Sequence, residues 1–399
     1  MSNNVEPSQE EYLDKLVKVW YSYLVSFKYL PTRRVIMRKT NKKLIGIILS
    51  IMLISSLLVA CRDNTETSGE GEGKTVGVCM PTKDLQRWNQ DGANMKKELE
   101  DAGYKVDLQY ANNEITQQVN QIENMITNGV DILVIASIDG GSLGTVLEDA
   151  KKQDIPVIAY DRLIMETDAI SYYATFDNYK VGEFQGQYIV DQLDLENVEG
   201  SFNIELFTGS PDDNNARYFF GGAMDILNPY IDSGKLIVVS GQKSFEEVAT
   251  LNWSTEEAQK RMENLITAYY ADGTELDVVL SSNDSCAIGI TNALVNAGYT
   301  KDNFPILTGQ DCDITAVKNI IAGLQSMSIF KDTRTLAAKV VEMVEAIMDD
   351  KDVPVNDTET YDNGKGVVPT YLCDPVFADI NNYKELLIDT GYYTEDQLN

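Results

Sequence analysis

The stretch that decides the fold is residues 131–162, which read DILVIASIDGGSLGTVLEDAKKQDIPVIAYDR. Within it the apolar run Asp131–Ile135 predicts a strand, Ser142–Gln153 predicts a helix and Pro156–Tyr160 predicts a second strand. A strand, a crossover helix and another strand form the repeating unit of a parallel sheet. The polar pair Asp161-Arg162 follows the second strand directly, at the end of the sheet where open parallel sheets bind ligands.

The same alternation of short apolar runs and longer amphipathic stretches extends from Lys74 towards the C-terminus. It starts again near Phe202, which predicts an α/β fold of two doubly wound parallel-sheet lobes. The other expected strands are Thr75–Met80, Lys105–Tyr110, Phe202–Phe207, Leu236–Ser240, Asp277–Leu280 and Pro305–Thr308. The other expected helices are Trp88–Ala102, Thr116–Asn128, Asn215–Leu227, Thr255–Tyr270, Ser285–Ala297 and Ile314–Ile321.

Three crossings are expected to join the lobes, near Asp177, Phe330 and Tyr371. The N-terminal lobe is then expected to comprise residues 75–176 and 331–366. The C-terminal lobe is expected to comprise residues 177–330 and 367–399.

The segment before the lobes is typical of an exported lipoprotein. Basic residues between Arg38 and Lys43 precede an apolar run that ends in Leu58-Val59-Ala60-Cys61, so residues 37–60 are expected to be a signal peptide. Cys61 would then carry a lipid, and residues 61–74 would form a flexible tether. An uncleaved anchor helix is the alternative, and either arrangement leaves the lobes outside the membrane.

Residues 1–36 do not fit an export signal, because acidic side chains stand where a signal peptide begins with basic ones. We expect that they are a mis-assigned extension and that the signal peptide begins at Met37. The alternative is an amphipathic helix whose apolar side would carry Leu13, Leu16, Val17, Trp20 and Leu24.

Composition argues against several classes of function. The chain has 62 acidic and 33 basic residues, and its formal net charge is −29. Such an excess repels nucleic acid and anionic lipid headgroups, and it favours a neutral or cationic ligand. The chain contains no histidine, which removes Ser-His triads, Cys-His pairs and histidine-ligated metal sites.

The cysteines after Cys61 show no C-x-x-C spacing, so they indicate neither a zinc site nor a redox site. We expect Cys79, Cys286, Cys312 and Cys373 to be small buried side chains, with a disulfide between Cys286 and Cys312 as the alternative. No cofactor and no metal are expected. The acidic clusters at 212–213 and 311–313 lack the loop spacing of a calcium site.

Candidate binding residues collect immediately after the carboxyl ends of the expected strands. Two lobes whose strand ends face one another would line a cleft from both sides. The candidates are Arg87, Trp88, Asp161, Arg162, Asp213, Asn214, Asn215, Asn283, Asp284 and Asp311, together with Trp253 and Lys331.

These side-chain types suit a monosaccharide. Aspartate accepts with two oxygens, arginine offers a rigid fork of donors and asparagine does both, so neighbouring hydroxyls can be held in pairs. Trp88 and Trp253 can cover the C–H faces of a sugar ring. An uncharged ligand is favoured because acidic candidates are opposed by basic ones, namely Asp161, Asp284 and Asp311 by Arg87, Arg162 and Lys331.

Each of these features also has a purely structural interpretation. The Asp161-Arg162 pair could be a surface ion pair, and the 212–215 segment could cap the helix that follows it. The two tryptophans could be core residues. Only the shared position at strand ends favours a binding site.

These residues lie in segments that resemble the type I periplasmic sugar-binding proteins, specifically the multiple-monosaccharide-binding ChvE-like receptors related to xylose-binding proteins. The resemblance covers nearly everything from Lys74 to the C-terminus. The matching segments are Met80–Thr82 with Arg87-Trp88, Val134–Gly140, Ile158–Leu163, Tyr172–Asn178, Ser210–Asn215, Gly309–Asp311 and Ile329–Arg334.

The resemblance implies a two-lobed binding protein that closes over an unmodified aldose, such as glucose, galactose, xylose or arabinose, and presents it to an ABC permease. It implies that Trp253 stacks on the sugar ring and that Asn283-Asp284 supplies a polar contact. It also implies that the other candidates line the pocket. The expected form is a monomer without enzymatic activity, lipid-anchored to the outer face of the bacterial cell membrane.

Three other functions are alternatives to this one. A chemoreceptor or a sensor kinase could read the same sugar-bound form. A glycoside hydrolase would use Asp284 and Asp311 as a carboxylate pair. Because the arginines and the lysine are expected to keep both carboxyls ionised, that enzyme would lack its general acid. A sugar-responsive repressor would need a basic helix-turn-helix at the N-terminus, where this chain has the export signal instead.

Overall fold

The computed structural model describes residues 73–399. The expected extension at residues 1–36, the signal peptide at residues 37–60, Cys61 and almost all of the tether lie outside the described residues. Within residues 73–399, no helix combines the length and the apolar character that crossing a bilayer requires.

The first lobe is built on a six-stranded parallel sheet in the order β11-β5-β4-β3-β1-β2. Central strands are fully buried apolar runs, as in Ile132–Ile135, which is why both faces of the sheet are covered. The strands are β1 Thr75–Met80, β2 Lys105–Tyr110, β3 Ile132–Ile135, β4 Val157–Tyr160, β5 Tyr172–Phe176 and β11 Thr370–Cys373.

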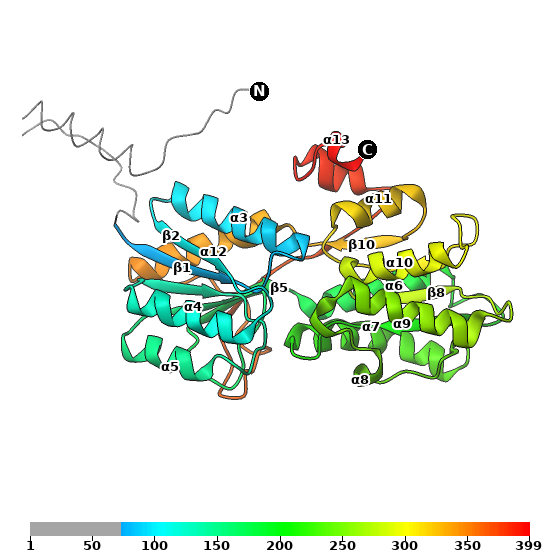
Figure 1. Cartoon of the computed structure of the whole chain (residues 1–399), viewed down its shortest axis with the longest axis horizontal. Coiled ribbons are helices and arrows are strands. Elements are labelled where there is room, and N and C mark those ends of the chain that lie inside the picture. Colours follow the sequence, from blue (N-terminus) through cyan, green and yellow to red (C-terminus); the bar gives the residue numbers. More distant parts are fainter. Residues whose placement is uncertain (1–72) are drawn as a thin grey trace, which may run out of the picture. The chain divides into compact units, whose positions relative to one another are not determined.

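Two helices cover each face of this sheet (Figure 1). On one face, α3 (Gln86–Asp101) packs along α12 (Thr333–Met348), and their apolar sides share one core cluster with β1 and β3. On the other face, α4 (Ile115–Thr127) and α5 (Gly144–Lys152) share a second cluster. The first lobe therefore takes one of its covering helices from a distant part of the chain.

The second lobe is built on a four-stranded parallel sheet in the order β7-β6-β8-β9. Its strands are β6 Phe202–Phe207, β7 Leu236–Val238, β8 Val278–Ser281 and β9 Ile306–Leu307. Two pairs of helices cover this sheet (Figure 1). One pair is α6 (Asn178–Gln192) with α7 (Asn214–Asp232), and the other is α9 (Thr255–Leu265) with α10 (Asp284–Asn296). The remaining elements are α8 Phe245–Val248, a 3-10 turn Leu251–Trp253, α11 Ile314–Ala322, α13 Glu395–Leu398 and π-helical turns Ile266–Tyr270 and Lys384–Asp389.

Glycines set the close packing of α6 on α7. A Cβ atom at Gly182 would lie 2.0 Å from the carbonyl oxygen of Phe219, and one at Gly222 would lie 2.2 Å from that of Tyr179. Only hydrogen fits between the two backbones at these points. Along the chain, α6 connects β5 of the first lobe to β6 of the second.

The expected fold class is confirmed, since both lobes carry a parallel sheet covered by helices. The predicted elements do not include β5, α6, α12 or the strands after Ser326. Those strands are β11 and an antiparallel pair made by β10 (Met327–Phe330) and β12 (Val376–Asp379).

One expected lobe boundary has to be corrected. Residues from 367 onward are expected in the second lobe, but Thr370–Cys373 pairs with β5 in the sheet of the first lobe. The next strand, Val376–Asp379, pairs with β10 instead. The strands β11 and β12 are separated by only two residues but belong to different sheets. The third crossing between the lobes therefore lies between Cys373 and Val376.

All four cysteines of the described segment are free and buried. Cys286 and Cys312 belong to different core clusters, so the alternative disulfide between them is not formed. Burial raises the pKa of the Cys286 thiol to about 12, so this group acts as a small apolar side chain.

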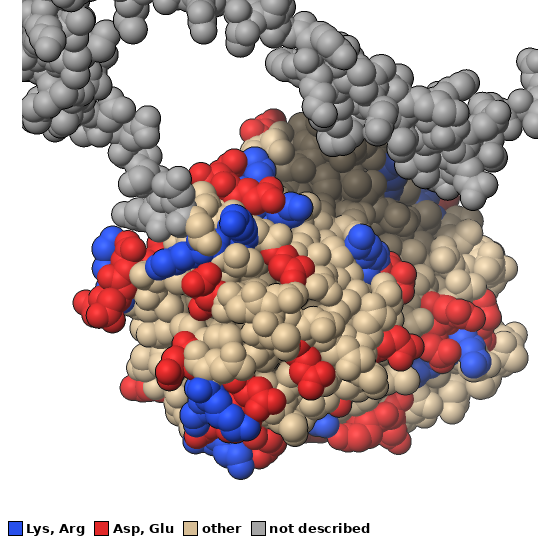
Figure 2. Space-filling model, turned by 60° about the vertical axis from the view of Figure 1, so that its left-hand side comes forward, with Lys and Arg blue, Asp and Glu red and all other residues tan. Residues whose placement is uncertain are grey.

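Charged side chains are spread over the surface. On the face in Figure 2, acidic and basic groups of the described residues are interspersed among uncharged ones, and these residues form no extended basic field there. Binding to a nucleic-acid backbone would require such a field.

Candidate functional site

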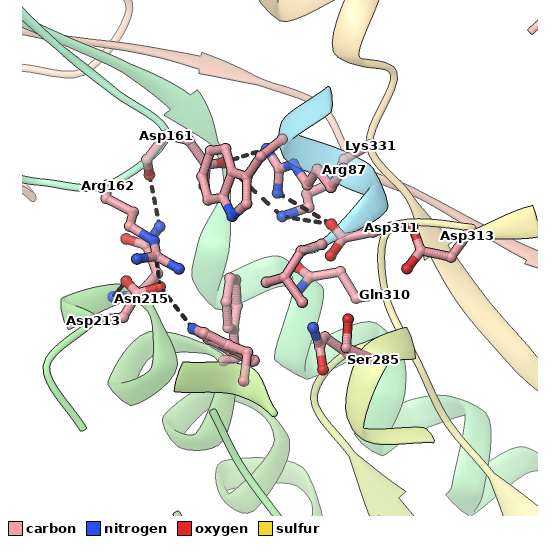
Figure 3. Close-up of a pocket in the computed structure, with 15 residues that line it drawn as sticks. Arg87, Asp161, Arg162, Asp213, Asn215, Ser285, Gln310, Asp311, Asp313 and Lys331 are labelled. Carbon is pink, nitrogen blue, oxygen red and sulfur yellow. Dashed lines mark hydrogen bonds and ion pairs between the residues drawn. The ribbon is translucent and has the colours of Figure 1, made fainter. Parts of the chain in front are cut away.

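A pocket of about 400 Å³, counted with its open mouth, lies where the carboxyl ends of the two sheets meet (Figure 3). Ten of the twelve candidate residues line it, and they come from both lobes. Its walls are made by Leu85, Arg87, Trp88, Asp161, Arg162, Asp213, Asn215, Phe219, Trp253, Asn283, Ser285, Gln310, Asp311, Asp313 and Lys331.

Arg87, in the first turn of α3, is the centre of one ion-pair network. Its Nη1 lies 3.1 Å from Asp311 Oδ1, its Nη2 donates to Asp161 Oδ1, and its Nε lies 3.0 Å from Asp91 Oδ2. Burial alone would lower the pKa of Arg87, but the three aspartates raise it above its ordinary value. The guanidinium is thus a fixed cation that joins the two lobes, since Asp311 follows β9 of the second.

Lys331 adds a second cation beside the same carboxylates. Its Nζ lies 3.1 Å from Asp311 Oδ1 and 4.0 Å from Asp161 Oδ1, and the residue is only 2 % exposed. Burial raises the pKa of Asp161, but the charges of Arg87, Lys331 and Arg162 outweigh it, so the pKa ends below its ordinary value. Asp161 is therefore an ionised acceptor at neutral pH.

Arg162 organises the opposite wall. Its Nε lies 2.9 Å from Asp213 Oδ2, and its Nη1 donates to the carbonyls of Ser137 and Ile138 at 3.1 and 3.3 Å. The guanidinium carbon lies 5.0 Å from the centre of the Trp88 ring, a stacking distance. Burial raises the pKa of Asp213, although the neighbouring Arg162 lowers it in part.

Trp253 is held at the floor of this wall. Its indole Nε1 donates to Asp213 Oδ2 at 3.1 Å, and the side chain is buried against Phe219. A Cβ atom at Gly209 would lie 1.9 Å from the Trp253 ring, so only glycine leaves room for the indole. The loop after β6 therefore fixes where the tryptophan lies.

Three pocket residues have left-handed backbones, with φ of 58° at Asp161, 56° at Trp253 and 97° at Asp311. Such conformations cost energy for residues other than glycine, and they recur at binding sites. Asp161 is held by its own carbonyl oxygen, which accepts from Tyr173 Oη at 2.6 Å and Asn215 Nδ2 at 2.6 Å. This arrangement aims the carboxylate into the pocket.

Asn214 does not line the pocket, although its neighbours on both sides do. It is the first residue of α7, and its side chain is hydrogen-bonded to that of Tyr218. Asn283 does line the pocket and also caps α10, because its Oδ1 accepts from the Cys286 amide at 3.0 Å.

Asp284 also lies outside the pocket wall, buried completely behind it. Its carboxyl accepts from Gln325 Nε2 at 2.9 Å, from Ser328 Oγ at 2.8 and 2.9 Å, and from the Asp313 amide at 2.9 Å. Burial and the nearby charges of Asp313 and Asp311 raise its pKa well above the ordinary value. The expectation that it stays ionised was wrong, because Arg87, Arg162 and Lys331 pair with other aspartates.

Five wall residues were not among the candidates: Leu85, Phe219, Ser285, Gln310 and Asp313. The strand-end rule does include Gln310, which with Asp311 follows the expected strand Pro305–Thr308, and it extends to Ser285, which adjoins Asp284. Asp313 lies two positions after Asp311 and is 6 % exposed, and its Oδ1 has no hydrogen-bond partner among the described residues. Burial and the charge of Asp311 raise its pKa to about 7, against the lowering effect of Arg87 and Lys331.

Three carboxylates of the wall make ion pairs with its three cations, namely Asp161 and Asp311 with Arg87 and Lys331, and Asp213 with Arg162. The fourth carboxyl, that of Asp313, makes no ion pair within residues 73–399. Asp213 thus takes the place that the sequence reading gave to Asp284. Such a pocket offers paired donors and acceptors and two indole faces to an uncharged polar ligand.

Residues 76–352 match the family described as "Periplasmic binding protein domain". The multiple sugar-binding periplasmic receptor ChvE of Rhizobium radiobacter is 54% identical over 326 residues, covering 81% of this chain and 92% of that protein. The D-xylose-binding periplasmic protein of Escherichia coli (strain K12) is 38% identical over 344 residues, covering 86% of this chain and 98% of that protein.

A solved structure gives the same result. An ABC transporter solute binding protein from Clostridium phytofermentans with bound β-D-glucose aligns with a TM-score of 0.80 at 67% sequence identity, covering 82% of this chain and 100% of that one. From the family match and these relatives, the chain belongs to the periplasmic binding proteins.

Proposed function

We propose that this protein captures a monosaccharide outside the cytoplasm, in the pocket between its lobes, and delivers it unmodified to an ABC permease. The observation that carries the proposal is the pair of buried networks, one around Arg87 and one around Arg162, that face a single pocket. The relatives named above, which are described as sugar-binding or contain glucose, support the same ligand class.

The networks keep acceptors available for a ligand. Among the described residues, the contacts of Asp161 and Asp311 with Arg87 and Lys331 all use Oδ1. Oδ2 of each carboxylate can therefore accept from a sugar hydroxyl, while the cations hold both groups rigid and charged. Trp88 and Trp253 offer ring faces to the apolar side of the sugar.

The carboxyl pair Asp284 and Asp311, which a glycoside hydrolase would use, is not assembled in the pocket. Asp284, which has the raised pKa of a general acid, lies behind the wall with its oxygens bonded to Gln325, Ser328 and the Asp313 amide. Catalysis needs the acid within reach of the glycosidic oxygen. Incubation with a nitrophenyl glycoside should therefore release no nitrophenol. Release of nitrophenol that is lost in an Asp284 variant would contradict this assignment.

Titration calorimetry tests the proposed ligand class. We expect the purified protein to bind at least one of D-glucose, D-galactose, D-xylose, L-arabinose and D-ribose with one-to-one stoichiometry, and not to bind an amino acid. Asp311→Ala should weaken binding about a hundredfold, because it removes one of the two carboxylates that buried Arg87 and Lys331 share. Asp302→Ala, an exposed aspartate of the same lobe, is the matched control. If the folded wild type binds none of these five sugars, the proposal is refuted.

We further propose that Cys61 carries the lipid that anchors the protein. The sequence Leu58-Val59-Ala60-Cys61 after a basic and then apolar segment supports this assignment. In cells fed an alkyne fatty acid, the wild type should be labelled and Cys61→Ser should not. Equal labelling of both would contradict the anchor without bearing on the sugar site.

A further inference from the structure

The last residues of the chain reach the first lobe beside the pocket. Tyr393 is 3 % exposed and belongs to a core cluster that also contains Phe330 and Leu387, and its ring contacts that of Tyr392 edge to face. Its hydroxyl accepts hydrogen bonds from Gln86 Nε2 at 2.8 Å and Gln90 Nε2 at 3.0 Å, both on α3. The same hydroxyl donates to the Cys312 carbonyl at 2.9 Å.

The directions of these bonds are fixed by the groups around them. Gln86 Oε1 accepts from the Ile314 amide at 3.2 Å, and Gln90 Oε1 accepts from Tyr392 Oη at 3.3 Å. Each glutamine must therefore turn its NH₂ group to Tyr393, and the Cys312 carbonyl can only accept. The phenol thus accepts twice and donates once, which uses its full hydrogen-bonding capacity.

Two of these three partners are chain neighbours of pocket residues. Gln86 precedes Arg87 and Cys312 follows Asp311, and the side chains of Arg87 and Asp311 are 3.1 Å apart across the pocket. The backbone at Asp311 and Cys312 is left-handed, with φ of 97° and 52°. A loop in this conformation needs outside contacts to hold it.

We propose that Tyr393 is a positioning residue for ligand binding, whose hydroxyl joins Gln86 to Cys312 and so stabilises the arrangement in which Arg87 and Asp311 face one ligand. The inference rests on the proposed sugar-binding function. Separating the lobes would break both bonds from α3 to the phenol and expose a phenol that is now buried. The contact therefore favours the closed arrangement, and the population of that arrangement scales the apparent affinity.

Tyr393→Phe tests the proposal because it removes the hydroxyl and keeps the ring in its cluster. The matched control is Tyr383→Phe, whose ring packs against the same cluster and whose hydroxyl lies outside this set of bonds. With a sugar that binds the wild type, we expect Tyr393→Phe to dissociate about tenfold faster while its association rate changes little. The ligand-free variant should also have a larger radius of gyration by X-ray scattering, and Tyr383→Phe should match the wild type in both measurements.

Wild-type dissociation kinetics and wild-type scattering for Tyr393→Phe would overturn the inference. An equal effect of Tyr383→Phe would also overturn it, since the loss would then come from the packing of the cluster. If the wild type binds no sugar, the proposed function fails. The scattering comparison of the ligand-free proteins still decides whether Tyr393 holds the lobes together.

Discussion

At the scale of single residues, Asp313 links the pocket to pH. Its pKa is raised to about 7 by burial and by Asp311, so its ionised form is disfavoured in the folded state. The folded protein then holds a proton that the unfolded chain releases near pH 4, and stability falls as pH rises from about 4 to about 7. We expect Asp313→Asn, which stays neutral, to flatten this descent.

The measurement is urea unfolding at pH 5 and pH 8. The loss of unfolding free energy between these two values should be smaller in Asp313→Asn than in the wild type by about 2 kcal/mol, given an upper limit of about 1.4 kcal/mol per pH unit. A descent will remain, because the pKa of Asp91 is also raised, to about 6, by burial. Asp302→Asn on the surface is the control. A descent as steep as the wild type's in Asp313→Asn would contradict the assignment.

The sequence predicted the location of the site better than the direction of its side chains. The rule that ligands bind after strand ends predicts eight of the ten candidates on the wall, and Trp253 and Lys331 are the other two. It could not separate Asn214 from Asp213 and Asn215, because the first turn of a helix points successive side chains to different sides. Nor could it show that Asp284 turns inward to Ser328, a contact that depends on a strand 44 positions later.

At the scale of elements, two loops of the second lobe set the position of Trp253. The Gly209 carbonyl accepts from the Thr250 amide at 3.1 Å, so the loop after β6 is tied to the segment that carries the tryptophan. A methyl group at residue 209 would overlap the indole, at 1.9 Å from its nearest atom. We expect Gly209→Ala to move Trp253, lower the sugar affinity and cost about 1–3 kcal/mol of stability.

Calorimetry and urea unfolding check this expectation side by side. Gly141→Ala is the matched control, because a Cβ atom there meets only Asp139, at 3.5 Å. Wild-type sugar affinity in Gly209→Ala would contradict this expectation. It would mean that the two loops can move apart to make room for the methyl group and that the position of the Trp253 indole does not determine sugar binding.

Strands that have a clear apolar pattern of their own were predicted correctly from the sequence. Thr75–Met80, Lys105–Tyr110 and Phe202–Phe207 are strands with the predicted bounds. The helix α6 gave a weak pattern, because its close packing uses Gly182 and Gly186 in place of large apolar side chains. The partners of β11 and β12 could not be read from four-residue segments, since pairing is decided by distant strands.

The helix α12 is a different case. Its apolar residues Leu336, Val340 and Val344 recur at helical spacing and are fully buried, so the pattern was present in the sequence. The helix falls within residues 331–366, which are expected in the first lobe, and there it packs along α3. The residue pattern shows whether a segment is a helix or a strand. Long-range contacts determine which sheet that segment joins or covers.

At the scale of the whole folded unit, the pocket belongs to neither lobe alone. Arg87 and Asp161 come from the first lobe, Asp213 and Asp311 come from the second, and three crossings join the lobes. A ligand that contacts both sides at once binds the closed arrangement more tightly than any open one, and so shifts the population towards closure. Short crossings at the end of β5 and the end of β10 can absorb such a rotation while both sheets stay intact.

X-ray scattering of the wild type, free and saturated with a sugar that calorimetry has shown to bind, tests this closure. We expect a smaller radius of gyration with sugar. Asp311→Ala at the same sugar concentration should keep the free profile, because it lacks the carboxylate through which Arg87 and Lys331 hold the second lobe. Superimposable profiles of free and saturated wild type would mean that the lobes are already closed before the ligand enters. The pocket would then fill through a local opening of its wall, and affinity would depend on that opening and not on the separation of the lobes.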